Sequence, residues 1–245
     1  MRTYKLTLAY EGTNYVGWQR QINGVSIQQL IEEAFAPLDG GRAPTVAGAG
    51  RTDAGVHALG QVASVHLDID LAASSVQRAL NVRLPQDIRV LGVVDATPGF
   101  HAQFHSTGKS YRYRIATTAV LSPFDRWFVW HAPGPRNVRA MQRAAEHFVG
   151  RHDFASFQPA GSPVRDTVRT IERVSIRDAG GEIVIDVDGN GFLRHMVRII
   201  AGTLADVGSG AREPQTIPDV LSARDRRAAG PTLPAAGLTL VSVRY

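Results

Sequence analysis

The 245-residue sequence contains no cysteine, only two lysines and no long hydrophobic run. Without cysteine the chain can form no disulfide bond and has no thiolate to bind a metal or attack a substrate. No segment approaches the roughly 18 apolar residues of a membrane-spanning helix. The start, MRTYKLTLAYEG, alternates polar and apolar residues and lacks the apolar stretch of a signal peptide. We therefore expect a cytoplasmic protein that does not enter a membrane.

The scarcity of lysine means that arginine supplies most of the positive charge. The only lysines are Lys5 and Lys109, so 25 of the 27 basic residues are arginine. The net charge is +5 and the calculated pI is about 10.0, so the surface should attract polyanions. Guanidinium groups bind phosphate through two hydrogen bonds and stack on bases. Nucleic acid, and RNA in particular, is the expected partner.

Hydrophobic periodicity predicts an α+β protein with two similar halves. The first half reads β-α-β-β-α-β over residues 3–10, 26–38, 44–48, 61–69, 71–84 and 87–96. The second half repeats much of this plan, with elements at residues 108–118, 137–150, 168–178, 182–189, 191–208, 217–225 and 237–245. The β-α-β-β-α-β order is that of ferredoxin-like folds.

This pattern predicts two ferredoxin-like domains, residues 1–103 and residues 104–245. We expect their antiparallel or mixed sheets to abut around a central cleft, where binding sites often lie. Gly208 is the expected C-terminal signal of the apolar helix that precedes it. Residues 119–137 and 208–235 fit neither domain, and their roles cannot be predicted from the pattern.

The stretch GAGRTDAG, residues 48–55, places a single carboxylate, Asp53, among glycines and beside Arg51. The glycines at 48, 50 and 55 can adopt positive φ and let the backbone approach a ligand. An adjacent guanidinium favours the ionised acid, and an ionised acid on such a loop is suited to act as a nucleophile or general base. The alternative is a turn in which the Asp53 side chain only bonds a nearby backbone N–H.

The same stretch also approaches the dinucleotide-binding pattern G-x-G-x-x-G. Asp53 stands at the third glycine position, where its charge would repel a pyrophosphate. The Gly-Lys-Ser/Thr of a phosphate-binding loop is missing as well. We therefore expect no nucleotide-dependent redox activity. His101 and His105 are four residues apart, but they lie in a predicted linker and no cysteine or clustered carboxylate completes a metal site.

The stretch GRTDAGVHALGQVA resembles the signature of the tRNA pseudouridine synthase A family, without a break. Five further segments agree with it in order and spacing: GTNYVGWQRQ, KSYRYRI, HDFASF, GFLRHMVRIIAGTL and PAAGLTLVSVRY. The resemblance covers nearly the whole chain and is poorest at residues 119–137 and 208–235. It implies an isomerase that converts uridine to pseudouridine at positions 38, 39 and 40 in the anticodon arm of tRNA. It also implies a homodimer of two-domain subunits that needs no cofactor.

Carried over by position, the resemblance makes Asp53 the catalytic aspartate and Tyr111 the active-site tyrosine. Arg198 corresponds to the arginine that pairs with the aspartate. The ring of Tyr111 is suited to stack on the uracil, and its hydroxyl to help remove the proton from C5. A target base in a stem must leave the stack first, and Arg51 is expected to contact the substrate in the vacated space. Taken singly, Tyr111 also fits a packing role, and Arg198 a solvated helix face.

Two questions stay open at this point. The carboxylate of Asp53 can add to C6, attack C1′, or assist through a glycal intermediate, and the sequence does not separate these routes. The β-α-β-β-α-β order also occurs in RNA-recognition modules that have no catalytic activity. Such modules carry aromatic residues in a K/R-G-F/Y-G/A-F-V-x-F/Y strand, and no such run occurs here. A non-catalytic RNA-binding module is therefore the second hypothesis.

Overall fold

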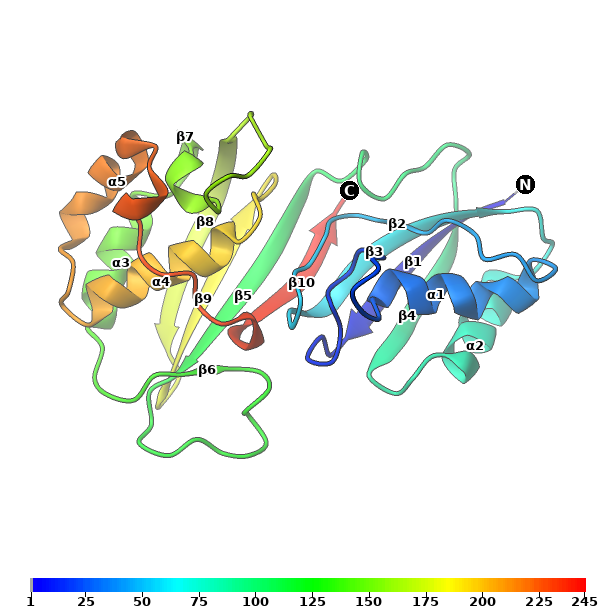
Figure 1. Ribbon diagram of the computed structural model, residues 1–245, viewed down its shortest axis with the longest axis horizontal. Helices are drawn as coiled ribbons and strands as arrows, with labels where there is room; N and C mark the ends of the chain where they lie inside the picture. The colour runs from blue at the N-terminus through cyan, green and yellow to red at the C-terminus, as the bar shows by residue number, and fades with distance from the viewer. Residues whose placement is uncertain (1) are drawn as a thin grey trace. The chain divides into compact units, whose positions relative to one another are not determined.

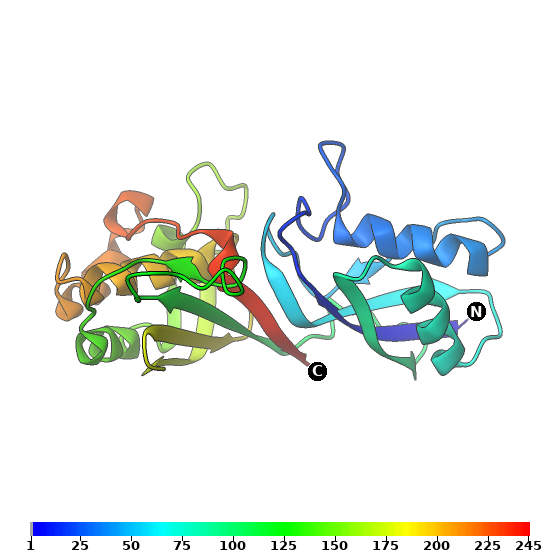
Figure 2. The ribbon, with the colours of Figure 1, turned by 90° about the horizontal axis from the view of Figure 1, so that it is seen from below.

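The computed structural model describes residues 2–245 and shows an α+β protein, as predicted (Figure 1). The chain divides into two compact units. The first is Met1–Thr107 together with Leu240–Tyr245, and the second is Gly108–Thr239. The sequence predicted a division into residues 1–103 and 104–245. In the structure, residues 104–107 and the last six residues group with the first unit. Figure 2 shows the same ribbon from below.

The first unit contains six elements in the predicted order β-α-β-β-α-β, followed by the last strand of the chain. The elements are β1 (Arg2–Tyr10), α1 (Ile27–Phe35), β2 (Ala47–Gly48), β3 (His57–Leu67), α2 (Ala73–Arg83), β4 (Ile88–Ala96) and, from Leu240 onward, β10 (Leu238–Arg244). The sheet order is β4-β1-β3-β10, and β2 pairs with β3. β1 is antiparallel to both β3 and β4. This arrangement is consistent with a ferredoxin-like unit.

Alternation along β1 determines which face is buried. Tyr4, Leu6, Leu8 and Tyr10 are buried, as period two predicts. Ser26 caps the start of α1, because its hydroxyl accepts a hydrogen bond from the backbone N–H of Gln29 at 3.3 Å. α1 and α2 lie side by side (Figure 1).

The end of the chain packs against a hydrophobic cluster in the first unit. Ala49, Val62 and Ala102 are buried there, with Phe100 and Val243 packed against them. The Tyr245 hydroxyl donates to the Ala102 carbonyl at 2.8 Å, and the Lys5 ammonium lies 3.9 Å from the centre of the Tyr245 ring. These contacts explain why the last six residues belong to the first unit and not to the second.

The second unit is built on the sheet β5-β9-β8-β7, with β6 parallel to β5 at its edge. Its elements are β5 (Gly108–Ala116), β6 (Trp130–His131), α3 (Val138–Glu146), β7 (Gly150–Asp153), β8 (Val168–Asp178), β9 (Glu182–Gly189), α4 (Met196–Gly208) and α5 (Ile217–Ala223). β8 and β9 have the predicted bounds. β6 and β7, with two and four residues, were not predicted.

α3 and α4 approach closely where α4 ends. A β-carbon on Gly208 would lie 2.6 Å from the Met141 sulfur, so the glycine lets the Met141 side chain pack directly against α4. The helix ends at Gly208 as predicted, but the left-handed glycine is Gly210, with φ +81°. Gly208 therefore serves helix packing, and the turn depends on Gly210. α3 begins after Asn137, whose side chain accepts from the Ala140 N–H at 3.0 Å.

Side-chain amides cover the backbone at two sheet edges. On the edge strand β4, Asn81 forms hydrogen bonds with both the N–H and the carbonyl of Val90, each at 2.9 Å. Gln77 donates to the carbonyls of Val90 and Leu91 at 3.2 and 2.9 Å. On β8, beyond its pairing with β7, Gln142 donates to the Ile176 carbonyl at 2.8 Å. Helices α2 and α3 thereby satisfy edge groups that would otherwise be open.

None of the helices within residues 2–245 combines the length and the apolar character that crossing a bilayer requires.

Candidate active site

Asp53 lies in the loop between β2 and β3 of the first unit, where its side chain is half-buried. Three backbone hydrogen bonds hold this loop around Asp53. The Trp18 N–H donates to the Thr52 carbonyl at 3.0 Å, the Gly55 N–H to the Tyr15 carbonyl at 3.3 Å, and the Val56 N–H to the Asp53 carbonyl at 3.1 Å. Two of these bonds come from the segment GTNYVGWQRQ. That segment therefore forms a seat for the loop that carries Asp53.

Two glycines of this segment pack directly against the backbone of the loop. A β-carbon on Gly17 would lie 2.5 Å from the Thr52 carbonyl oxygen and 3.0 Å from the Asp53 carbonyl carbon. A β-carbon on Gly12 would overlap the Val56 carbonyl oxygen. Gly17 also has φ +101°, a conformation that glycine adopts most easily. Any side chain at either position would displace the residues around Asp53.

A buried polar network lies under the other side of the loop. The Tyr10 hydroxyl and the Thr52 hydroxyl are 2.8 Å apart. The Gln61 amide donates to the Gly50 carbonyl at 2.9 Å and to the Tyr10 hydroxyl at 3.4 Å. Burial raises the pKa of Tyr10 to about 12, so this hydroxyl keeps its proton at neutral pH.

The glycines of GAGRTDAG play different parts from those expected. Of the expected three, at 48, 50 and 55, only Gly55 has a positive φ, +77°. Gly48 instead makes room for the Trp18 indole, which a β-carbon would overlap. The expectation of positive φ was therefore wrong for Gly48 and Gly50. The close approach at Gly48 is to the protein's own side chain.

The neighbours of Asp53 in sequence differ in exposure. Arg51 is exposed and Thr52 is buried. His57, four residues after Asp53, accepts a hydrogen bond at Nδ1 from the Gly12 N–H at 3.0 Å. His57 thus ties the start of β3 to the seat segment.

Tyr111 lies on β5 of the second unit and is only 7% exposed. It is paired across the sheet with Val187 of β9. Its ring packs edge-on against Phe192, with ring centres 5.1 Å apart and an interplanar angle of 81°. Phe192 belongs to the segment GFLRHMVRIIAGTL, so the structure brings two of the matching segments together at this tyrosine.

Arg198 lies in α4 of the same unit and is half-buried. Its Nε donates to the Leu233 carbonyl at 2.7 Å, and its own carbonyl accepts from the Leu233 N–H at 3.4 Å. Burial raises the pKa of Tyr113, and the positive charge of Arg198 opposes this rise. Arg198 is therefore held beside Tyr113 and does not lie on a solvated helix face.

The segment around Leu233 was missed by sequence reasoning, which assigned no role to residues 208–235. The Tyr113 hydroxyl donates to the Pro234 carbonyl at 2.8 Å, and the Gly230 N–H donates to the Thr203 hydroxyl at 2.9 Å. Gly202 of α4 has no room for a β-carbon, because the Pro231 carbonyl oxygen occupies that space. This segment packs along α4 and orients Arg198. The glycine at position 202 was the signal of this close approach.

Asp53 belongs to the first unit, and Tyr111 and Arg198 belong to the second. Their combination into one active site, and the central cleft that would hold them, remain predictions. Arg51 likewise remains a predicted contact with the substrate.

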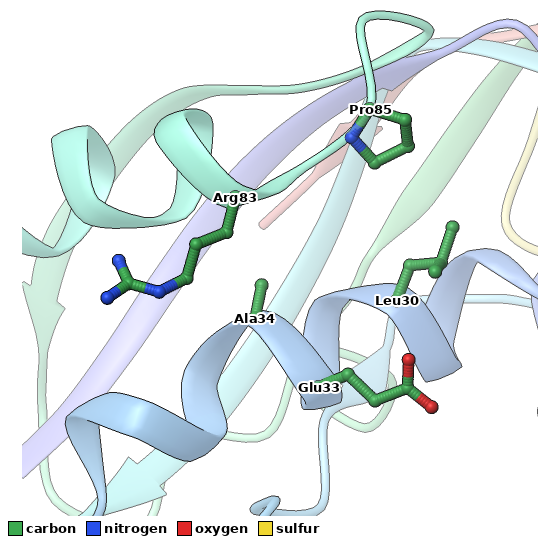
Figure 3. A pocket seen from close by; sticks show the side chains of 5 residues that line it. All are labelled: Leu30, Glu33, Ala34, Arg83 and Pro85. Atoms are coloured by element: carbon green, nitrogen blue, oxygen red, sulfur yellow. The ribbon is translucent and has the colours of Figure 1, made fainter.

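A separate hollow of about 280 Å³ lies in the first unit between α1 and the end of α2. It is lined by Leu30, Glu33, Ala34, Arg83 and Pro85. Figure 3 shows the charged ends of Arg83 and Glu33 pointing away from one another. A ligand site needs polar groups that converge on one point, and this hollow does not offer them.

Comparison with known proteins agrees with the family resemblance seen in the sequence. The family model described as tRNA pseudouridine synthase matches residues 7–105 and 144–245. A relative from Pelobacter propionicus, named tRNA pseudouridine synthase A, is 47% identical over 245 residues, and the match covers 100% of both chains. Relatives with the same name from Geobacter sulfurreducens and Moorella thermoacetica are 46% and 45% identical, again over 100% of both chains.

Proposed function

Because this chain belongs to the tRNA pseudouridine synthase family, we propose that it isomerises uridine to pseudouridine in the anticodon arm of tRNA, at positions 38, 39 and 40. The observation that carries the proposal is full-length similarity to relatives named tRNA pseudouridine synthase A. An excess of arginine over lysine, with a net charge of +5, supports an RNA substrate because guanidinium binds phosphate and stacks on bases.

The reaction determines which groups the site must supply. It breaks the N1–C1′ bond of uridine, turns the uracil over and joins C5 to C1′, while the proton on C5 is lost and N1 gains one. Product and substrate have the same composition, so the stoichiometry calls for no redox cofactor. A carboxylate near C1′ and C6 can add to C6, attack C1′, or assist while a glycal forms. We assign this carboxylate to Asp53.

The rigid setting of Asp53 supports this assignment. The backbone on both sides of Asp53 is fixed by Trp18, Tyr15 and Gly17, and a reacting group gains rate from being held in one geometry. A loop that only needed to turn would not require a glycine pressed against the backbone of residues 52 and 53. The half-buried position leaves the side chain partly accessible to a substrate.

Tyr111 and Arg198 take the roles that the family resemblance implies. We propose that Arg198 pairs with the Asp53 carboxylate and keeps it ionised. The Tyr111 ring stacks on the detached uracil while it turns, and the hydroxyl helps remove the proton from C5. The edge-on packing of Tyr111 against Phe192 supports the stacking role, since it holds the ring in one orientation.

The target base must leave the RNA stack before it can react, which costs a few kcal/mol when it lies in a stem. Arg51 is exposed and lies two residues from Asp53. We propose that its guanidinium enters the space vacated by the base or binds the displaced phosphate.

Substitution of the carboxylate tests the function. Purified wild-type protein, Asp53→Asn and Asp219→Asn are each incubated with unmodified tRNA, and pseudouridine is mapped along the RNA. Asp219 is exposed at the start of α5, so it controls for the loss of one negative charge. We expect Asp219→Asn to modify positions 38, 39 and 40 like the wild type. Asp53→Asn should bind tRNA but lose about 10⁴-fold or more in rate, on the scale seen when a nucleophile is removed.

The same measurement distinguishes the proposed enzyme from the second hypothesis, a non-catalytic RNA-binding module. If wild-type protein bound tRNA but formed no pseudouridine, the chain would be a non-catalytic RNA-binding module. Modification only outside the anticodon arm would contradict the proposed substrate position while leaving the reaction type intact.

We also propose that the protein acts in the cytoplasm and as a homodimer, as the resemblance implies. Val120, Phe124 and Trp127 are exposed within residues 117–129 of the second unit, and a dimer that used this loop would cover these apolar side chains. Sedimentation equilibrium should give twice the 26.5 kDa chain mass, and a monomer mass at micromolar concentration would contradict the dimer. Cell fractionation tests the location.

A further inference from the structure

Tyr10 is the last residue of β1 and lies under the loop that carries Asp53. It is 4% exposed, and its partners Thr52 and Gln61 are 6% and 0% exposed. Three polar side chains are therefore buried together at one point of the first unit. Burial of polar groups lowers stability unless they are hydrogen-bonded to one another, so the hydroxyls and the amide must hold their relative positions.

The order of donors in this network follows from the Gln61 amide. Its oxygen accepts from the Val62 N–H at 3.2 Å, so its nitrogen is the end that donates to the Gly50 carbonyl and the Tyr10 oxygen. The Tyr10 oxygen also shares a hydrogen bond of 2.8 Å with the Thr52 hydroxyl, in which either group can donate. The network thus contacts the loop at Gly50 and at Thr52, the residue immediately before Asp53.

We infer that the Tyr10 hydroxyl is a positioning group for Asp53, which it holds in place through Thr52. This inference rests on the proposed role of Asp53. Gly17 lies against the backbone of residues 52 and 53, and the Thr52 side chain is held by Tyr10 of β1. A loop fixed at two points cannot slide or rotate freely, and a displacement of about 1 Å at a reacting group costs on the order of 10²-fold in rate.

A purely apolar filling of this space would stabilise the fold as well as the network does. Removal of both partners of a buried hydrogen bond in favour of apolar groups of the same shape is nearly neutral for stability. A hydrogen bond fixes the orientation of its partner group, and apolar contacts in the same space would not. The network accordingly bears on the geometry of the loop more than on the free energy of folding.

β1 offers a matched control for this inference. Tyr4 is buried on the same strand, and its hydroxyl donates to the Leu71 carbonyl at 2.8 Å. Tyr4→Phe and Tyr10→Phe each delete one hydroxyl from a buried tyrosine of β1. Only Tyr10→Phe removes a contact with the Asp53 loop.

The experiment measures kcat and KM on unmodified tRNA, together with thermal unfolding, for both variants. We expect kcat of Tyr10→Phe to fall about 10- to 100-fold with KM within about twofold of wild type, while Tyr4→Phe keeps the wild-type kcat. The unfolding temperatures of the two variants should fall by similar amounts. Equal kcat values for the two variants would overturn the inference, and so would a defect of Tyr10→Phe confined to KM.

A second pair of variants covers the case in which Tyr10→Phe fails to fold. Thr52→Val removes the hydroxyl at nearly constant shape, whereas Thr52→Ser keeps it. We expect Thr52→Val to lower kcat as Tyr10→Phe does, and Thr52→Ser to restore most of the rate. Similar rates for Val and Ser would refute the role of the hydroxyl. An inactive wild type would instead overturn the proposed function, and this inference with it.

Discussion

Gly17→Ala tests whether the seat segment fixes the position of Asp53. The substitution adds one methyl group at a residue with φ +101°, and that methyl would lie 2.5 Å from the Thr52 carbonyl oxygen. Two penalties combine. A left-handed backbone costs a non-glycine residue about 1–2 kcal/mol, and an inserted methyl group in a packed region costs about 1–3 kcal/mol. We expect the free energy of unfolding to fall by about 2–5 kcal/mol.

The methyl group has no room unless the backbone of residues 52 and 53 moves. Ordinary contact between a methyl carbon and a carbonyl oxygen is about 3.4 Å or more, so the loop must shift by several tenths of an ångström to about 1 Å. The pseudouridine-forming rate should therefore fall on the order of 10²-fold even at a temperature where the variant is fully folded.

Gly99→Ala serves as a control that distinguishes the cost of the left-handed backbone from the cost of the steric collision. Gly99 has φ +81° in the same unit, and no atom lies within 4 Å of the position that a β-carbon would take there. It therefore carries the backbone penalty without the collision. Urea unfolding gives the stability of each variant, and single-turnover kinetics give the rate. If Gly17→Ala were no less stable than Gly99→Ala and as active as wild type, the reasoning about the seat would be wrong.

Two further predictions concern the helix crossing and the exposed arginine. Gly208→Ala places a methyl group 2.6 Å from the Met141 sulfur, so the free energy of unfolding should fall by about 1–3 kcal/mol. In a Met141→Ala background the Gly208→Ala substitution should cost almost no stability. Urea unfolding of the wild type, the two single variants and the double variant measures this. An equal loss with and without Met141 would contradict the proposed contact between Gly208 and Met141. Arg51→Ala should slow pseudouridine formation in stem positions more than in loop positions, because only a stem base must be unstacked. Unchanged rates at both kinds of position would rule out its proposed role.

Much of the fold was predictable because the signals were local. Period-two alternation identified β1, and the turn glycines between residues 178 and 182 separated β8 from β9. The strands β6 and β7 are too short to show a period. The start of β3 at His57 was missed because the signature GRTDAGVHALGQ is rich in glycine and hides the alternation.

The residues that hold the candidate site were harder to predict, because their partners are distant in sequence. Nothing local indicates that Gly17 packs against Thr52, or that the Tyr10 hydroxyl meets the same residue. The family resemblance says which positions carry the active-site residues, namely Asp53, Tyr111 and Arg198. It does not say that Leu233 holds Arg198. Such contacts depend on the tertiary fold and have no period or spacing in the chain.

The amides of Gln77 and Asn81 have a consequence for how this protein associates with others. Because both the N–H and the carbonyl of Val90 are already engaged by Asn81 of α2, a strand from another molecule cannot pair with β4 at Val90 without first displacing that side chain. Sheet-to-sheet growth, the usual route from a folded protein to fibrils, therefore meets an obstacle on this side. A partner that approaches β4 at Val90 must recognise side chains and not an open backbone.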